Sequence, residues 1–377
     1  MKENYKEIIE EEWKKFQENK KYPNIVLLGC TGSGKSSLIN DIFENNIAEI
    51  NDIRPETKDF KLYLGKEMGK NINLIDSKGY ELSNSYNLYV ESLKQQVKEL
   101  KKSGDKIHLV WFCLAVTKKR IEEIDIKTLE EVLKIEDFRK RICVVITKCD
   151  EDDINGSIAK SYKKIINDIF DDIKIFEVTT NKKIDIPELK KEKEEMLKWS
   201  ANKLETEELK ESFISAQMGS LELKKDKAEK IISDAMVKAG IIGISPIPFS
   251  DAIILAPLQA NMILKIINVY NLDGVFSKLG MIGELVLNKV GKNLAQNIFK
   301  SIIGNALKFI PLIGSYAGGI INASVASSLT YALGKGISEI SYFNCTKILK
   351  GENVDIIEIF SENAIMDEVE KYLKKWG

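Results

Sequence analysis

The chain has 377 residues, of which 56 are Lys or Arg and 57 are Asp or Glu, so its formal net charge is −1. This length suits two domains. The charges nearly cancel and no long basic run stands out, so the composition does not demand a nucleic-acid partner and we expect none. The five cysteines follow no disulfide or metal-binding spacing, and a single histidine, His108, excludes a triad or zinc cluster built on several histidines.

The first half of the chain predicts an α/β fold. Residues 3–20 predict a charged amphipathic helix, and their Lys- and Glu-rich composition does not fit a signal peptide. From residue 22, apolar strand segments alternate with amphipathic helical segments, which is typical of a mostly parallel, doubly wound sheet covered on both faces. Strands are expected near 24–29, 59–64, 71–76, 107–116, 141–147 and 173–178, and helices near 35–44, 85–102, 122–135, 157–171 and 187–198.

A glycine-rich loop follows the first predicted strand. Residues 29–37 have the pattern G-x-x-x-x-G-K-[ST], in which glycines let successive N–H groups turn toward phosphates and the following helix contributes its N-terminal amides. Lys35 is expected to reach the β- and γ-phosphates, and Ser36 to bind Mg²⁺. The predicted phosphate-binding residues are Gly29, Thr31, Gly32, Ser33, Gly34, Lys35, Ser36 and Ser37.

Two more motifs stand at strand ends, where ligands collect in open α/β sheets. The first runs from Asp76 to Gly79; we expect Asp76 to reach Mg²⁺ through water and the Gly79 amide to sense the γ-phosphate. The second is Thr147-Lys148-Cys149-Asp150. The Asp150 carboxylate can accept two hydrogen bonds from the N1–H and N2–H₂ edge of guanine, and the Lys148 stem can lie along the base.

With these ordered motifs, residues 22–198 resemble an Era-like GTPase of the translation-factor-related class. The segment from Pro55 to Asp59 resembles the first switch of that group, which implies that Thr57 binds Mg²⁺ and the γ-phosphate. The segment Val178-Thr179-Thr180 resembles the last guanine-contacting loop, so Thr179 and Thr180 are candidate base-binding residues, with the Thr180 amide meeting the base. The resemblance also implies GTP or GDP with Mg²⁺ as ligands.

One position departs from that group, and a second differs from Ras-like proteins. Thr147 replaces the usual asparagine, which predicts a weaker tether between base loop and phosphate loop, and Tyr80 stands where Ras-like proteins have a water-orienting glutamine, which predicts slow hydrolysis. Arg54 has the spacing of the built-in arginine finger of G-protein α subunits, and a solvated loop arginine is the competing interpretation. Hydrolysis completed by a partner or by dimerisation is a further alternative.

The character of the chain changes after a Glu- and Lys-rich helical connector at 199–230. Residues 231–377 predict an apolar helical domain. Its segments 239–264 and 309–334 are long enough for membrane spans, although prolines and polar residues interrupt them. Two interpretations of these segments therefore stay open. They form either a buried hairpin of a helical bundle, which inserts reversibly into a membrane or not at all, or constitutive membrane spans. The last helix, which ends near Trp376, could lie on an anionic membrane or pack on the bundle.

This second half resembles the YcjF-type helical domain of unknown function that follows Era-like GTPase domains. The resemblance covers residues 228–345 and rests on the segments from Pro246 to Asp251, from Ile310 to Gly314 and from Thr330 to Gly334. The order of a helix, a GTPase core and a helical domain also resembles immunity-related GTPases, although a shared architecture transfers little about function.

We therefore expect a slowly hydrolysing GTP switch, in which contacts at Thr57 and Gly79 order two loops and bias the helical domain toward membrane association or self-assembly. The partners left open are a membrane surface, a nucleotide-dependent homodimer and a protein effector. The alternatives are a ribosome or RNA assembly GTPase and a GTP-sensing defence effector that permeabilises membranes. The expected location is the cytoplasm, with a peripheral or integral position at the cytoplasmic membrane as the alternative.

Overall fold

In the computed structural model the chain divides into two units, an α/β unit of Lys21–Ser220 and a helical unit of Met1–Lys20 with Leu221–Gly377. The structure describes residues 11–43 apart from 13 and 17, 55–80 apart from 58, 59, 69 and 78, 86–243 apart from 136, 247–248, 255–272, 320–321, 323–354 apart from 353, and 362–373.

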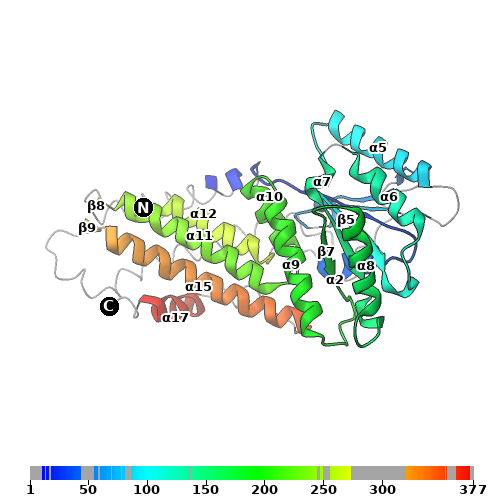
Figure 1. Ribbon diagram of the computed structural model, residues 1–377. Coiled ribbons are helices and arrows are strands. Elements are labelled where there is room, and N and C mark those ends of the chain that lie inside the picture. Colours follow the sequence, from blue (N-terminus) through cyan, green and yellow to red (C-terminus); the bar gives the residue numbers. More distant parts are fainter. Residues whose placement is uncertain are drawn as a thin grey trace. The chain divides into compact units, whose positions relative to one another are not determined.

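The α/β unit is built on a sheet whose described strands follow the order β2-β3-β4-β1-β5-β6-β7 (Figure 1). The strands are β1 (Asn24–Leu28), β2 (Pro55–Thr57), β3 (Phe60–Tyr63), β4 (Asn73–Ser77), β5 (Leu109–Ala115), β6 (Ile142–Thr147) and β7 (Lys174–Glu177). The pairs from β4 through β1 and β5 to β7 are parallel, whereas β3 is antiparallel to β4 and to β2. The predicted mostly parallel fold is therefore confirmed.

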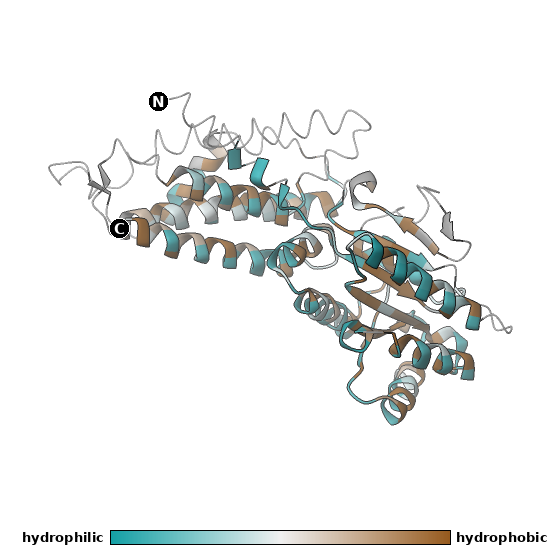
Figure 2. Ribbon diagram, turned by 90° about the horizontal axis from the view of Figure 1, so that it is seen from above, coloured by the Kyte–Doolittle hydropathy of each residue, from teal (hydrophilic) through white to brown (hydrophobic). Residues whose placement is uncertain are grey.

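Helices cover both faces of this sheet. They are α2 (Lys35–Phe43), α4 (Gly65–Met68), α5 (Tyr86–Lys102), α6 (Glu123–Leu133), α7 (Phe138–Arg141), α8 (Ser157–Ile169), α9 (Pro187–Lys203) and α10 (Glu207–Ala216). The central strand β1 is an unbroken apolar run because both of its faces are buried. Val26 and Leu28 join one core cluster with residues of α5, α6 and α8. The strands are accordingly the most consistently hydrophobic elements in Figure 2.

The opposite face of the sheet holds an aromatic cluster that includes α10. Phe43 stacks on Trp111 with ring centroids 6.0 Å apart, and Phe213 of α10 meets both rings edge-on. Trp111 also donates an indole hydrogen bond to Ser200 Oγ at 3.1 Å. The α/β unit consequently runs through Ser220, whereas the sequence places the end of this domain at residue 198 and a connector at 199–230.

The helical unit contains polar side chains that bond across its helices. Its elements are α11 (Leu221–Ile242), α12 (Ala256–Val269), α15 (Ala323–Leu349), α17 (Glu362–Leu373) and the antiparallel strand pair β8 (Ile247–Pro248) and β9 (Ile320–Ile321). Gln259 of α12 donates to Thr330 of α15 at 3.2 Å, and the hydroxyls of Tyr270 and Ser338 are 3.0 Å apart. The helices in this unit show hydrophilic and hydrophobic residues along their length in Figure 2.

Close approach of two helices in this unit depends on a glycine. A Cβ placed on Gly334 of α15 would lie 2.7 Å from Ile232 Cγ1 of α11. Such a contact is shorter than packed side chains accept, so the absence of a side chain at Gly334 lets the helices meet closely.

Both apolar segments considered as membrane spans extend beyond the described residues. Within 239–264, α11 ends at Ile242 and α12 begins at Ala256, while 244–246 and 249–254 lie outside the description. Residues 309–319 and 322 of the second segment and the final residues 374–377 also lie outside it. Among the helices that can be described, none combines the length and the apolar character needed to cross a membrane.

Candidate nucleotide-binding site

The glycine-rich loop lies between the end of β1 and the start of α2. Gly29, Gly32 and Gly34 have φ angles of +139°, +79° and +82°, which side chains rarely permit. A Cβ on Gly29 would stand only 2.4 Å from the Cys113 carbonyl oxygen. The glycines therefore allow a tight loop packed against β5. Thr31, Ser36 and Ser37 are exposed, whereas the Ser33 side chain is buried.

Lys35 is buried at the start of α2 and folds back onto this loop. Its ammonium donates to the carbonyl oxygens of Gly29 and Cys30, each at 3.0 Å. Burial lowers the pKa of Lys35, and the nearby acidic Asp76 opposes that shift. A cation thus stands inside the loop, where a phosphate would offer it a stronger acceptor than a carbonyl oxygen.

Ser36 and Asp76 bring a hydroxyl and a carboxylate together beside Lys35. The Ser36 hydroxyl donates to Asp76 Oδ2 at 3.0 Å. Asp76 lies in β4, which pairs with β1, so the sheet register sets this contact. Oxygen ligands of this kind suit Mg²⁺, which takes a few protein oxygens together with phosphate oxygens and water. The residues present therefore fit the ion predicted with the nucleotide.

Thr147 connects the base loop to the phosphate loop. Its hydroxyl donates to the Ser33 carbonyl oxygen at 2.8 Å, although the chain lacks the asparagine usual at this position. A Cβ on Gly34 would lie 3.1 Å from Thr147 Oγ1, so the two loops are in close contact. A tether is thus present between the loops, made by a hydroxyl.

The predicted base loop is held by residues after β7. The Thr179 hydroxyl donates to Asp150 Oδ1 at 2.6 Å, and the Asn181 amide donates to Oδ2 at 3.2 Å. Lys148 has a left-handed φ of +57° at the start of this turn, and the Thr180 side chain is half-buried. The structure brings Asp150 and Thr179 together, and the two donors fix the orientation of the carboxylate.

Gly79 and Tyr80 lie against the phosphate loop. The Thr31 N–H donates to the Tyr80 carbonyl oxygen at 3.2 Å, and a Cβ on Gly79 would stand 2.6 Å from the Thr31 nitrogen. The Tyr80 side chain is 2 % exposed, and its hydroxyl donates to Asp125 Oδ1 at 2.6 Å. Burial and the Asp125 carboxylate raise the pKa of Tyr80 well above its usual value, so its phenol stays protonated.

Two predicted site residues are described only in part or not at all. Thr57 ends β2 opposite Phe60, but its side chain lies outside the description. Arg54 lies outside the described residues altogether. The roles predicted for Thr57 in metal binding and for Arg54 as a finger consequently stay predictions.

Sequence reasoning missed Tyr89, Asp125 and Asn181. The Tyr89 hydroxyl accepts the Gly29 N–H at 3.4 Å and donates to Ser77 Oγ at 2.9 Å, and burial raises its pKa. Asp125 bonds the Glu122 N–H at the start of α6 as well as Tyr80. The acidic residues at the start of that helix were a readable capping signal, but nothing local marked their contact with Tyr80.

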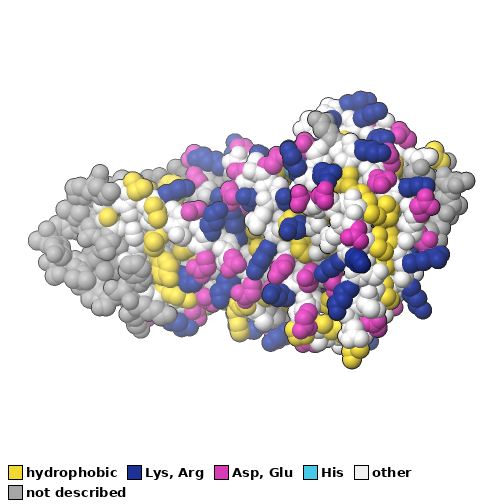
Figure 3. Space-filling model, viewed as in Figure 1, with side chains coloured by type: hydrophobic (Ala, Val, Ile, Leu, Met, Phe, Trp, Pro, Cys, Tyr) yellow, Lys and Arg dark blue, Asp and Glu magenta, His cyan; other side chains and the backbone are white. Residues whose placement is uncertain are grey.

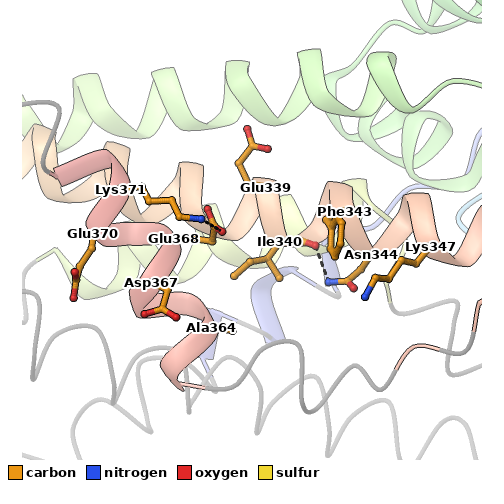
Figure 4. A pocket seen from close by; sticks show the side chains of 10 residues that line it. All are labelled: Glu339, Ile340, Phe343, Asn344, Lys347, Ala364, Asp367, Glu368, Glu370 and Lys371. Carbon is orange, nitrogen blue, oxygen red and sulfur yellow. Dashed lines mark hydrogen bonds and ion pairs between the residues drawn. The ribbon is translucent and has the colours of Figure 1, made fainter.

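A separate pocket of about 820 Å³ lies in the helical unit between α15 and α17 (Figure 4). Its lining carries both charges, including Glu339, Asp367, Lys347 and Lys371, and includes none of the predicted nucleotide-binding residues. On the face drawn in Figure 3, basic and acidic side chains are intermingled over the described surface. No large single-sign patch is visible on that face.

Two parts of the chain match known protein families. Residues 24–148 match the family described as 50S ribosome-binding GTPase, and residues 208–362 match the domain of unknown function DUF697. No curated protein matches the chain.

Similar solved structures are those of GTPase domains. Era in complex with MgGDPNP and 16S ribosomal RNA is 17% identical over 50% of this chain and 58% of its own, with a TM-score of 0.35. The G domain of the FeoB iron transporter of T. maritima is 21% identical over 48% of this chain and 99% of its own, with a TM-score of 0.30. Toc33 from Arabidopsis thaliana with Mg²⁺ and GMPPNP is 16% identical over 48% and 80%, with a TM-score of 0.33. The match spans little more than half of the Era chain. The P-loop fold of the α/β unit thus agrees with the match of residues 24–148 to the 50S ribosome-binding GTPase family, and residues 208–362 are similar to DUF697.

Proposed function

We propose that the chain is a GTP-binding switch that hydrolyses GTP slowly and uses its nucleotide state to control the helical domain. The observation that carries the proposal is the arrangement of Lys35, Ser36 and Asp76 in a glycine cradle: a buried ammonium lies beside a paired hydroxyl and carboxylate. These are the groups that hold phosphates and Mg²⁺ in P-loop proteins. The Mg²⁺ ion supplies charge neutralisation at the phosphates when bound.

The preference for guanine is supported by Asp150. Its two oxygens are held by Thr179 and Asn181, which leaves the carboxylate oriented as an acceptor for the two donors on the guanine edge. Adenine lacks that donor pair, so the same carboxylate disfavours ATP.

Slow turnover is supported by the position of Tyr80. A residue that orients the attacking water must face the γ-phosphate. The Tyr80 hydroxyl instead donates to Asp125 inside the core. The side chain next to Gly79 is therefore engaged elsewhere in this conformation.

A role of the helical domain in membrane association or self-assembly is supported by an apolar stripe on α11. Val237 and Ile241 are one helical turn apart, 55% and 63% exposed. Residues four apart share a helix face, so together they offer a surface for a lipid or a second protein.

The family match suggests ribosome binding as the alternative output, and the mixed charge seen in Figure 3 does not favour it.

Nucleotide titration tests the first part of the proposal. The full chain should bind GTP and GDP in the presence of Mg²⁺ and prefer both to ATP. Lys35→Ala should weaken GTP binding on the order of 100-fold, because hydrogen bonds to charged groups contribute about 1.5–3 kcal/mol each. Unchanged affinity in a folded variant would remove the phosphate loop from the binding site.

Flotation with anionic liposomes tests the second part. The full chain is compared without nucleotide, with GDP and with a non-hydrolysable GTP analogue, and with the variant Val237→Ser/Ile241→Ser. Flotation only with the analogue, reduced in the variant, supports a nucleotide-gated membrane switch. A shift in sedimentation with the analogue alone would support self-assembly, and co-sedimentation with ribosomal subunits would favour the alternative.

A further inference from the structure

A second buried lysine stands near the phosphate loop. Lys118 ends the short 3₁₀ turn η1 (Val116–Lys118) that directly follows β5. Its ammonium is fully buried and has no hydrogen-bond partner among the residues that the structure describes. A buried charge without a partner costs free energy, so we expect a ligand, an ion or a water molecule to complete such a group. The neighbouring Lys119, by contrast, is exposed.

The sheet places this turn at the binding site. Ala115, the last residue of β5, pairs with Thr147, whose hydroxyl bonds the phosphate loop at Ser33. Further back, Phe112 of β5 pairs with Leu28, the last residue before that loop. The turn therefore leaves the sheet at the edge where the phosphate loop and the base loop meet.

Lys118 also lies within electrostatic range of Lys35. Burial is the main reason why the pKa of Lys35 is lowered, and the charge of Lys118 lowers it further, against the opposing effect of Asp76. Two ammonium groups repel each other, and an anion with several charges bound between them would stabilise both.

We propose that Lys118 is a second phosphate-binding lysine, which contacts the terminal phosphate of the bound nucleotide and favours the triphosphate over the diphosphate. The inference rests on the proposed nucleotide function and adds a residue to it. Lys35 stands at the end of the site where Gly79 closes over the loop, because a Cβ on Gly79 would lie 3.0 Å from Lys35 Nζ. Because the charge of Lys118 acts on Lys35, we expect its ammonium to contact the phosphate bound at that end of the site. Lys118 would also supply positive charge near the terminal phosphate, whereas the Tyr80 side chain is bonded to Asp125 in the core.

The test is a titration of the full chain with fluorescent GDP and with a fluorescent non-hydrolysable GTP analogue, both with Mg²⁺. Lys118→Met keeps the apolar stem and removes the charge, Lys118→Arg keeps the charge, and Lys119→Met is the matched control at the exposed neighbour. We expect Lys118→Met to bind the GTP analogue about 10-fold or more weakly and GDP within about twofold of wild type, as for the loss of one charge-assisted hydrogen bond. Lys118→Arg should restore most of the difference, and Lys119→Met should behave as wild type.

Three results would overturn the inference. Equal loss of affinity for both nucleotides with a lower melting temperature would make Lys118 a structural residue. Unchanged affinity for the GTP analogue in Lys118→Met would show that its ammonium does not meet the terminal phosphate. Absence of binding of either nucleotide by the wild-type chain would remove the proposed function itself, and the inference with it.

Discussion

The two units of the chain place their polar side chains differently. In the helical unit, such groups bond each other across helices, as Gln259 does with Thr330 and Tyr270 with Ser338. In the α/β unit they gather at the ends of β1, β4 and β6 around one loop. Groups that satisfy each other specify packing, whereas groups that converge on a backbone cradle provide a binding site. Chemistry is thus expected in the α/β unit and helix packing in the other.

The largest effect is expected where the α/β unit reads the base. Asp150→Asn replaces one acceptor oxygen with an NH₂ donor, which repels the guanine N2–H₂ and suits the carbonyl that xanthine has there. The ratio of GTP to xanthosine triphosphate affinity should fall by about 1,000-fold, because two hydrogen bonds worth about 1.5–3 kcal/mol each are exchanged. Competition titration measures it, with the exposed Asp171→Asn as control. An unchanged ratio would take Asp150 out of base recognition.

The parts of the α/β unit that the sequence could predict depend on local signals. The phosphate loop needs glycines at fixed spacing between a strand and a helix, and Gly29, Gly32 and Gly34 take up the positive φ angles that this implies. Buried parallel strands such as β1 and β6 are apolar runs that stand out from the helices. Helix and strand positions near the site could therefore be read with errors of a few residues.

The contacts that the sequence could not predict join distant residues. The Tyr80 and Asp125 side chains are 45 residues apart, and Thr179 meets Asp150 across 29. The burial of Phe213 against Phe43 likewise extends the α/β unit beyond a boundary read from composition. Composition reports local polarity, whereas these contacts depend on which surfaces the fold brings together. The short strand β2 has too few residues to show the alternation of apolar and polar side chains by which a strand is recognised in a sequence.

Acid sensitivity should also belong to the α/β unit, which contains the single histidine of the chain. His108 Nδ1 accepts the Asn24 N–H at 3.0 Å, and burial lowers the pKa of His108 from 6.5 to about 4. The folded state then binds fewer protons than the unfolded state between those values. The free energy of unfolding should therefore fall by about 3 kcal/mol as the pH drops from about 6.5 to about 4.

Chemical denaturation across this pH range measures the effect. His108→Asn keeps an acceptor for the Asn24 N–H but cannot titrate there, so its stability should lack this contribution. The difference between the two profiles isolates His108 from the carboxylates that also titrate at low pH. Parallel profiles for wild type and variant would place the acid sensitivity elsewhere.

In the helical unit, the corresponding test is one of packing. Gly334→Val places a branched side chain where even a Cβ would lie 2.7 Å from Ile232 Cγ1. The free energy of unfolding should fall by about 1–3 kcal/mol, the usual cost of overpacking, despite the better helix propensity of valine. Thermal unfolding measures it, and Leu349→Val, at an exposed position of the same helix, is the control. If Gly334→Val were as stable as the control, α11 and α15 would not be in close contact there.

The smallest expected effect concerns Tyr80 in the α/β unit, where one substitution tests whether a side chain contributes to stability or to hydrolysis. Tyr80→Phe removes a buried hydrogen bond to Asp125, so stability should fall by about 1 kcal/mol, with more if the carboxylate finds no replacement. The rate of GTP hydrolysis should stay within about twofold of wild type, because a hydroxyl bonded to Asp125 cannot also orient water at the phosphate. Tyr162→Phe, which loses a buried hydroxyl bonded to the Ala115 carbonyl, is the matched control for stability. Single-turnover hydrolysis measures the rate, and a tenfold decrease in Tyr80→Phe alone would mean that this hydroxyl leaves Asp125 during the reaction. In that case, the core contact seen here would be one of two positions of Tyr80, and the boundary between packing and chemistry would run through that side chain.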